Sequence, residues 1–185
     1  MKTILMALAL ALASVATTNA QNTNNKQQLR KERKEMTAKI DSMKWQDAIA
    51  AVNDTAFTLE ADQLVSKSGK TIYVDSNINF IRLKGKKAVV QISPDAARLG
   101  ANGLGGVTLE CNVTSYSAKT DNKGNKILSM NVLGNFLSAR IDIFIYKDSN
   151  KASATVTPNL NPASVTLNGS LLPNRFSNVF KGTTR

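Results

Sequence analysis

Between residues 53 and 175 the chain alternates apolar and polar side chains with a period of two, and turn signals interrupt the alternation at short intervals. Phe57, Leu59 and Ala61, for example, are each followed by a polar residue. This period places successive side chains on opposite faces of a β-strand. We therefore predict nine short strands, at residues 57–62, 71–74, 80–83, 88–92, 107–114, 127–133, 140–146, 152–156 and 164–167.

Hairpin-length turns connect most of the predicted strands, for example at residues 84–87, 121–125 and 147–151, and Asn168-Gly169 closes the last strand. No β-α-β spacing occurs after residue 53, so strands that follow one another in sequence are expected to pair antiparallel. The predicted fold is mainly β: an up-and-down barrel or a sandwich of about 8–9 strands.

The stretch before the strands, residues 29–52, has the pattern of an amphipathic helix. Leu29, Met36, Ile40 and Met43 recur at spacings that keep them on one side of a helix, and the first half is markedly basic. Two alternatives stay open, a helix that packs on the β-domain and a helix that lies on a membrane surface. Residues 21–28 are polar and predict a flexible tether, and residues 176–185 a C-terminal tail.

Residues 1–20 have the anatomy of a secretory signal peptide. A short positive start precedes an uncharged apolar run at residues 4–16, and small residues then precede a predicted cleavage between Ala20 and Gln21, with Ala16 as an alternative site. No Cys follows the apolar run, so we do not expect a lipoprotein. The predicted location is the periplasm or the cell exterior.

The composition narrows the possible chemistry. The chain has no His and one Cys, which excludes Ser-His or Cys-His catalysis, a thiolate zinc cluster and an internal disulfide. We predict no cofactor, no metal site and no catalytic residue. Lys and Arg number 24 against 13 Asp and Glu, for a net charge of +11. For an exported monomer the matching partners are anionic lipid headgroups or acidic polysaccharides at the envelope surface, and not nucleic acid.

Individual side chains suggest three kinds of site. Carboxylates occur on the predicted strands at Glu60, Asp62, Glu110 and Asp142. They leave a carboxylate-based hydrolase as a distant third hypothesis, after the two non-enzymatic hypotheses given below. Cys111 falls on an apolar strand face, where we expect a buried and unreactive thiol. If the sheet closes, four aromatic residues could line a ligand cavity below the glycine-rich stretch 93–106, namely Phe57, Phe80, Phe144 and Tyr146.

Several segments together resemble a known family. They are FTLEADQL at 57–64, NFIRLKGKKAVVQIS at 79–93, GGVTLE at 105–110 and VTLNGSLLP at 165–173. They are similar to the secreted family of Gram-negative Bacteroidota catalogued as domain of unknown function 4251. The resemblance covers residues 45–175 and implies an exported, lipocalin-like β-barrel or related sandwich without an assigned activity. The Asp-Ser/Thr-apolar tripeptide that Bacteroidota use for O-glycosylation occurs at Thr55 and Ser42.

Two functional hypotheses follow. In the first, the protein is a non-enzymatic binding module that holds a small apolar ligand inside the sheet or presents a face to an envelope partner. In the second, it is a solid-core structural or interaction protein that contacts partners through its basic helix. The size of the inward-facing side chains separates the two hypotheses, because small residues such as Ala88, Ala152 and Ala154 leave room for a cavity and large ones fill it.

Overall fold

The computed structural model describes residues 2–95, 100–160 and 163–184, with side chains from residue 25 onward. These residues form one helix, α1 (Lys2–Asn53), nine strands and a short 3-10 helix, η1 (Asn174–Phe176). The strands are β1 (Ala56–Ser66), β2 (Thr71–Tyr73), β3 (Phe80–Lys84), β4 (Lys87–Ile92), β5 (Val107–Thr120), β6 (Lys126–Leu133), β7 (Ser138–Ile145), β8 (Lys151–Pro158) and β9 (Val165–Pro173). The chain divides into two compact units, Met1–Ile40 and Asp41–Arg185.

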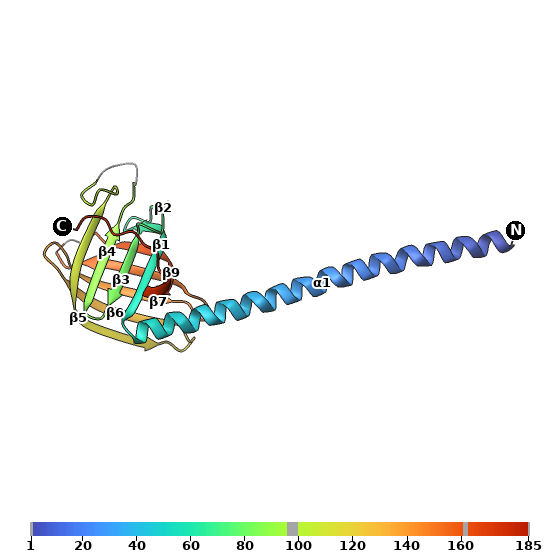
Figure 1. The fold of residues 1–185 in the computed structure, drawn as a ribbon, viewed down its shortest axis with the longest axis horizontal. Helices are drawn as coiled ribbons and strands as arrows, with labels where there is room; N and C mark the ends of the chain where they lie inside the picture. Colours follow the sequence, from blue (N-terminus) through green and yellow to red (C-terminus); the bar gives the residue numbers. More distant parts are fainter. Residues whose placement is uncertain (1, 96–99, 161–162, 185) are drawn as a thin grey trace. The chain divides into compact units, whose positions relative to one another are not determined.

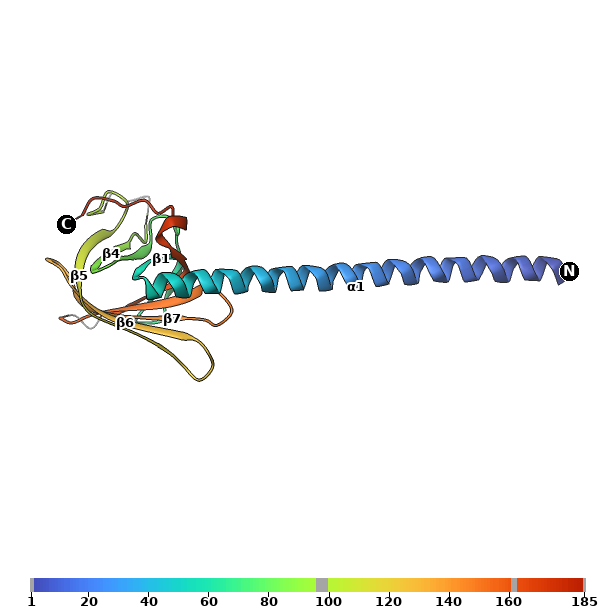
Figure 2. The ribbon, with the colours of Figure 1, turned by 60° about the horizontal axis from the view of Figure 1, so that its bottom comes forward.

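The second unit contains a closed antiparallel barrel. From β3 to β9 each strand pairs with the next one in sequence, and β9 pairs with β1, which in turn pairs with β3. These pairings close eight strands into a ring, and β2 is added to β1 as an extra strand (Figures 1 and 2). The predicted up-and-down topology is confirmed, and the ring decides between the barrel and the sandwich.

Strand β1 closes the barrel because it pairs with both β3 and β9, and β2 is its third partner. One of its edges pairs first with β3 and then with β2, while the other edge pairs with β9. The β1–β9 register shifts between Ala61 and Gln63, which is a β-bulge. Gly169 lies opposite Ala61, so the predicted strand end at Asn168-Gly169 is wrong and β9 continues to Pro173. A Cβ at Gly169 would lie 1.9 Å from the carbonyl oxygen of Glu60, so only glycine fits here.

The barrel core consists of the inward side chains of all the ring strands together with the end of α1. Ala48, Ala51 and Val52 belong to the same buried cluster as the strand residues, and Trp45 packs against it. The Tyr116 hydroxyl from β5 donates a 2.6 Å hydrogen bond to the carbonyl oxygen of Val52. The last turns of the helix therefore pack on the β-domain, which is the first of the two alternatives, for this part of residues 29–52 only.

Helix α1 begins well before the predicted start at residue 29. It includes residues 21–28, whose polar composition predicts a tether, and residues 2–20 of the predicted signal peptide. No Gly or Pro occurs between residues 2 and 53, so nothing in the sequence breaks the helix. Cleavage after Ala20 stays a prediction. Among the described residues, no helix has both the length and the apolar character needed to cross a membrane.

Candidate interaction surfaces

The four aromatic residues predicted to line a cavity do not lie together. Phe57 is buried in the barrel core, whereas Phe80, Phe144 and Tyr146 lie outside the core cluster. Phe80 pairs with Glu60 across the outer face of the sheet, and the ring of Phe144 meets that of Tyr146 edge-on at 5.0 Å between centroids. Strand β7 points its isoleucines inward, so Phe144 and Tyr146 face outward. Phe80, Phe144 and Tyr146 therefore do not line the interior.

Side chains occupy the interior of the barrel. Large apolar residues from all sides of the ring are fully buried and form one contiguous cluster. The small inward residues Ala88, Ala152 and Ala154 belong to that same cluster, so they pack against their larger neighbours. A cluster of this kind is the interior that small barrels fill with side chains. The three hollows described for this chain open elsewhere, on the outer faces of the sheet and beside the end of α1.

A cluster of buried polar side chains lies outside the core, on the outer face of β3, β4 and β5. We call it the outer polar cluster, and its members are Asn79, Gln91, Ser93, Asn102 and Thr108. The Thr108 hydroxyl donates to Gln91 Oε1 at 2.7 Å, and Asn102 Nδ2 donates to Ser93 Oγ at 2.9 Å. Among the described residues every buried side-chain nitrogen and oxygen has a hydrogen-bond partner. The network is therefore fully satisfied and holds its side chains in fixed positions.

The C-terminal tail covers the outer polar cluster. Residues 176–185 were predicted as a tail beyond the β-domain, but the described part lies along the barrel (Figure 1). The side-chain amide of Gln91 donates to the carbonyl oxygen of Phe180 at 2.9 Å and accepts from the backbone N–H of Gly182 at 2.8 Å. The Phe180 N–H donates to the Asn77 carbonyl at 2.8 Å, and the Thr183 N–H to that of Asn102 at 3.1 Å. These four hydrogen bonds all use main-chain atoms of the tail.

Gly182 is the point of closest approach between the tail and the barrel. A Cβ at this position would lie 2.6 Å from the carbonyl oxygen of Asn102 and 2.9 Å from Leu104 Cδ1. Both neighbours belong to residues 100–106 of the glycine-rich stretch, which pack under the tail. Any side chain at residue 182 would therefore push the tail away from the barrel.

The strand carboxylates each have a partner of their own. Lys181 forms an ion pair with Glu110, which holds the pKa of Glu110 below its usual value. Arg140 forms a 2.8 Å ion pair with Asp142, which also accepts a 2.5 Å hydrogen bond from Ser129. Burial alone would raise the pKa of Asp142, but these partners outweigh it and lower the pKa. A general acid needs a raised pKa, so neither residue is tuned for that role.

The other two carboxylates in the hydrolase hypothesis, Glu60 and Asp62, lie before and within the bulge in β1. Glu60 accepts a 2.7 Å hydrogen bond from the Ser177 hydroxyl of the tail. Asp62 is exposed and lies 3.9 Å from Lys151 Nζ. Each carboxylate therefore has a different neighbour, and the sheet does not join them into a shared site.

Cys111 is buried in the core, as the strand pattern predicts. Desolvation raises the pKa of its thiol to about 11, and the neighbouring charge of Glu110 adds to the effect. A thiol becomes a nucleophile when its pKa is lowered, so Cys111 has the properties of a packing residue.

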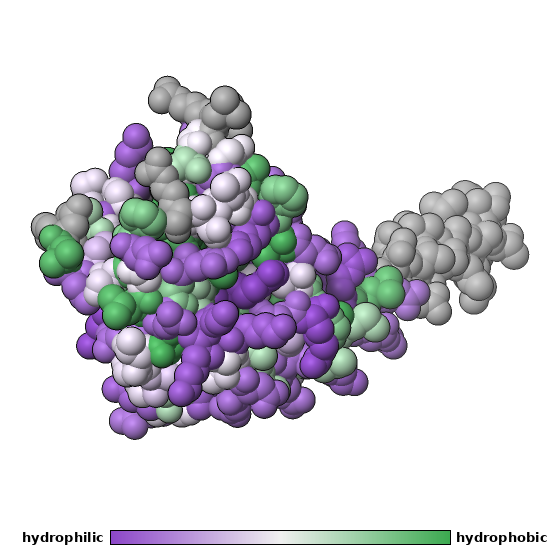
Figure 3. All heavy atoms as spheres, turned by 60° about the vertical axis from the view of Figure 1, so that its left-hand side comes forward, coloured by the Kyte–Doolittle hydropathy of each residue, from purple (hydrophilic) through white to green (hydrophobic). Residues whose placement is uncertain are grey.

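An open, polar hollow lies on the outer face of β5, β6 and β7. It has a volume of about 290 Å³, and serines 115, 117 and 129 line it together with Lys119 and Arg140. The lining also includes Ile127, Met130 and Asn131, so hydroxyl, amide, cationic and apolar groups all meet there. The face of the molecule that Figure 3 shows is mainly hydrophilic, with apolar residues scattered over it. This hollow therefore offers hydrogen-bonding groups to a partner.

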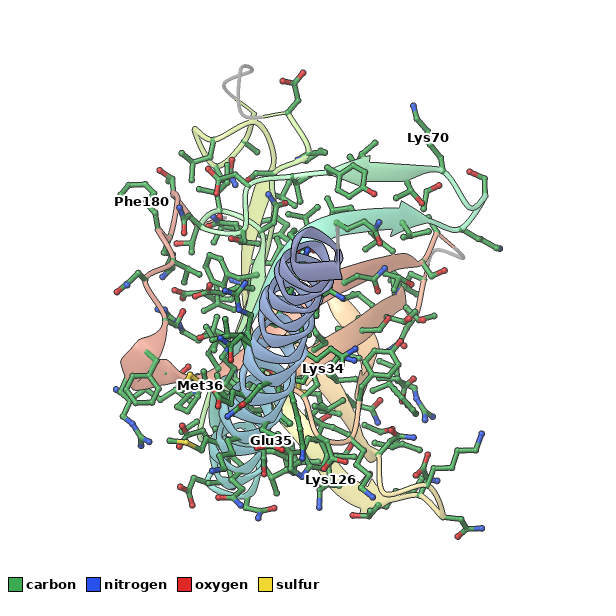
Figure 4. All side chains as sticks on the ribbon, turned by 90° about the vertical axis from the view of Figure 1, so that its right-hand side faces the viewer. Lys34, Glu35, Met36, Lys70, Lys126 and Phe180 are labelled. Atoms are coloured by element: carbon green, nitrogen blue, oxygen red, sulfur yellow. The ribbon has the colours of Figure 1, made fainter. Side chains whose placement is uncertain are left out.

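The helix in the first unit combines an apolar stripe with positive charge. Leu29, Met36 and Ile40 are 62%, 65% and 46% exposed. Basic residues outnumber acidic ones on residues 25–40, with Lys26, Arg30, Lys31, Arg33, Lys34 and Lys39 against Glu32 and Glu35. Figure 4 labels Lys34, Glu35 and Met36 on this segment. Every side chain from residue 25 to residue 40 is exposed, so both the stripe and the charge face solvent.

The two predicted O-glycosylation residues are both partly exposed. Ser42 lies within α1, and Thr55 lies in the turn between α1 and β1. Thr55 has a φ of 50°, an unusual conformation for a β-branched residue, and its carbonyl oxygen accepts a hydrogen bond from the N–H of Gly85 at 2.8 Å. Glycosylation at these residues stays a prediction.

Comparison with known proteins identifies the family. The profile of the domain of unknown function DUF4251 matches residues 39–171. The chain belongs to the DUF4251 family. A crystal structure of a DUF4251 family protein from Bacteroides eggerthii DSM 20697 is similar to this chain, with a TM-score of 0.67 and 36% sequence identity. The match covers 80% of this chain and 99% of that one. No curated protein matches the chain. The family resemblance inferred from the sequence is thus confirmed.

Proposed function

We propose that this DUF4251 protein is an exported, non-enzymatic interaction protein of the bacterial envelope, with a solid core, that contacts its partner through its outer surface. The observation that supports this function best is the contiguous cluster of buried side chains inside the barrel. A barrel that holds a small apolar molecule needs interior space, and here core side chains fill the ring. The geometry therefore favours the solid-core hypothesis over the internal-ligand hypothesis.

The contact element is the exposed basic segment of α1, and its partner is an anionic lipid surface. Residues 25–40 carry six basic and two acidic side chains, so the segment is attracted to negative headgroups. Leu29, Met36 and Ile40 supply apolar side chains that can enter the boundary between headgroups and acyl chains. A peripheral protein of the periplasm or cell exterior uses both contributions together.

The non-enzymatic part of the proposal rests on the ionisable groups. The sequence contains no His, and the described Asp, Glu and Cys residues do not gather into a group of three or more. Glu110 and Asp142 are each paired with a cation, and their pKa values are lowered. These carboxylates stay ionised at neutral pH and act as partners for Lys181 and Arg140.

Vesicle binding tests the proposal. The mature chain should co-sediment with vesicles that contain phosphatidylglycerol and not with vesicles of phosphatidylcholine alone, and salt should weaken the binding. Each basic residue near such a surface contributes about 1 kcal/mol, so the double change Arg30→Gln and Lys34→Gln should weaken binding by roughly 30-fold. The matched control is Lys67→Gln with Lys70→Gln, which removes the same charge from the exposed β1–β2 connection. Equal losses in both variants, or no binding at low salt, would refute the proposal.

Native mass spectrometry of the protein purified from its own envelope tests the remaining alternative. The expected mass is that of the protein chain alone. A small molecule bound in stoichiometric amount would support the internal-ligand hypothesis instead. A surplus equal to sugar units would show glycosylation, and the variants Thr55→Ala and Ser42→Ala would assign it to one residue.

A further inference from the structure

The outer polar cluster holds the tail as a receptor holds an extended peptide. Gln91 is fully buried, and its amide group bonds to the carbonyl oxygen of Phe180 and the N–H of Gly182 at once. The amide group thus bonds to the C=O of one tail residue and to the N–H of the second residue after it. A neighbouring β-strand makes the same pair of hydrogen bonds. Carbonyl oxygens of Asn77 and Asn102 accept from the tail on either side of this clamp. Main-chain contacts of this kind supply affinity in β-strand addition.

The surface of β3, β4 and β5 that lies under the tail, which we call the groove, also selects side chains at two positions. Lys181 pairs with Glu110, so a basic residue is favoured there. The next position admits only glycine, because a Cβ at Gly182 would collide with the backbone of Asn102. Phe180 is 62% exposed and projects away from the barrel in Figure 4, so its side chain adds little selectivity. The groove therefore favours an extended segment with the sequence pattern x-Lys-Gly, in which x is any residue.

Gln91 stays fixed independently of the tail. Its Nε2 also donates to the Ile78 carbonyl oxygen at 2.9 Å, and its Oε1 also accepts from Thr108 at 2.7 Å. Both of these partners belong to the barrel, so the clamp keeps its orientation when the tail leaves. The hydrogen bonds that orient Gln91 are thus independent of the tail that occupies the groove.

From this geometry we infer that the groove on β3, β4 and β5 is a peptide-binding site that takes the C-terminal segment of a second copy of the chain when its own tail is released. The tail is the segment of this chain that presents x-Lys-Gly in an extended conformation, whereas Gly85 and Gly124, which also follow lysines, lie in hairpin turns with positive φ. The tail of the same chain competes at an effective concentration in the millimolar range. Exchange between copies therefore requires that the resident tail be displaced.

A peptide-binding experiment on the full chain tests the site. The variant Gly182→Val disables the resident tail and leaves every barrel residue unchanged. A labelled peptide of residues 174–184 should bind this variant at least tenfold more tightly than it binds the wild-type chain. The same peptide with valine in place of Gly182 should bind at least tenfold more weakly. Limited proteolysis should show that the tail of the variant is released. A tail that stays protected, or equal binding of the two peptides, would overturn the inference.

A mixing experiment tests the second copy as the occupant. The variant Gln91→Leu removes the clamp but keeps an intact tail, and Gly182→Val keeps the clamp but lacks a usable tail. Each variant alone should sediment as a monomer, and the equimolar mixture should contain a dimer. Peptide binding without a dimer in the mixture would show that the groove serves another peptide and would overturn this assignment. If circular dichroism shows that Gln91→Leu does not fold, wild-type chain at rising concentration replaces it as the tail donor, and a dimer with Gly182→Val is again required.

Discussion

Replacing Gly169 by alanine should open the seam between β1 and β9. The new Cβ would lie 1.9 Å from the carbonyl oxygen of Glu60 and 2.8 Å from Ala61 Cα. The first distance is about 1.5 Å short of the 3.4 Å at which ordinary contact begins. Both neighbouring atoms belong to the backbone, so no side-chain rotation can relieve the overlap. The two strands must separate beside the bulge, where the register already shifts between Ala61 and Gln63.

Two contributions set the size of the effect. Overpacking of a well-packed site costs about 1–3 kcal/mol, and each ladder hydrogen bond lost at the seam costs about 1 kcal/mol more. A total of about 2–5 kcal/mol corresponds to a fall in Tm of roughly 5–15 °C for a domain of this size. The Tm is measured by circular dichroism, and urea unfolding at fixed temperature gives the free energy of unfolding independently.

Gly69→Ala is the matched control for this measurement. Gly69 has a φ of 84°, but a Cβ there would meet no atom within 4 Å. This substitution therefore costs only the strain of a left-handed backbone, about 1 kcal/mol. If Gly169→Ala lowers the Tm by no more than Gly69→Ala does, the close approach at the seam is not what requires glycine, and the argument fails.

Three further predictions concern titratable groups. The Cys111 thiol, whose pKa is about 11, should resist Ellman's reagent at pH 8 in the folded protein and react once urea unfolds it. Burial raises the pKa of Tyr116 to about 12, so absorbance at 295 nm should show that Tyr116 is still protonated at pH 10. Tyr116→Phe should cost about 1 kcal/mol by losing the bond to Val52. The folded-state pKa of Glu110 lies below its ordinary value of 4.5, so its stabilising contribution is present above pH 4.5 and is lost as the pH falls further. The protection factors of the tail amides, which correct for the pH dependence of the intrinsic exchange rate, should therefore fall below pH 4.5, and Glu110→Gln should remove that fall.

The strands could be predicted because their side chains alternate between a buried and an exposed face. All nine predicted strands occur, and their bounds differ most from the prediction in β1, β5 and β9. Strand β5 continues to Thr120 although its alternation breaks down after residue 114, because the register against β6 shifts between Val113 and Ser115. The same shift brings Tyr116 to the inner side, where it reaches the end of α1. Sequence periodicity cannot show such a change of phase.

The tail groove could not be predicted from the sequence in the same way. Its hydrogen bonds to the tail use backbone atoms of Phe180, Gly182 and Thr183, which leave no mark on the pattern of side chains. Gln91 lies between apolar residues in a strand, where a polar residue ordinarily indicates a solvent-facing position. Its burial depends on a segment about ninety residues away that returns across the outer face. The aromatic residues do not indicate an internal cavity for a related reason, because Phe80 also lies on that outer face.

The pairing of the first strand with the last has a consequence for how the chain folds. Neighbouring strands from β3 onward can form hairpins as soon as they are synthesised, because their partners are adjacent in sequence. The seam is different: Thr58 bonds to Asn174 across 116 residues. Until β9 has been made, one edge of β1 keeps its hydrogen-bonding groups unpaired, which is the condition in which strands aggregate or pair with the wrong chain. During synthesis the barrel is therefore an open sheet with an unpaired edge. Completion of β9 pairs that edge and removes the risk of aggregation there.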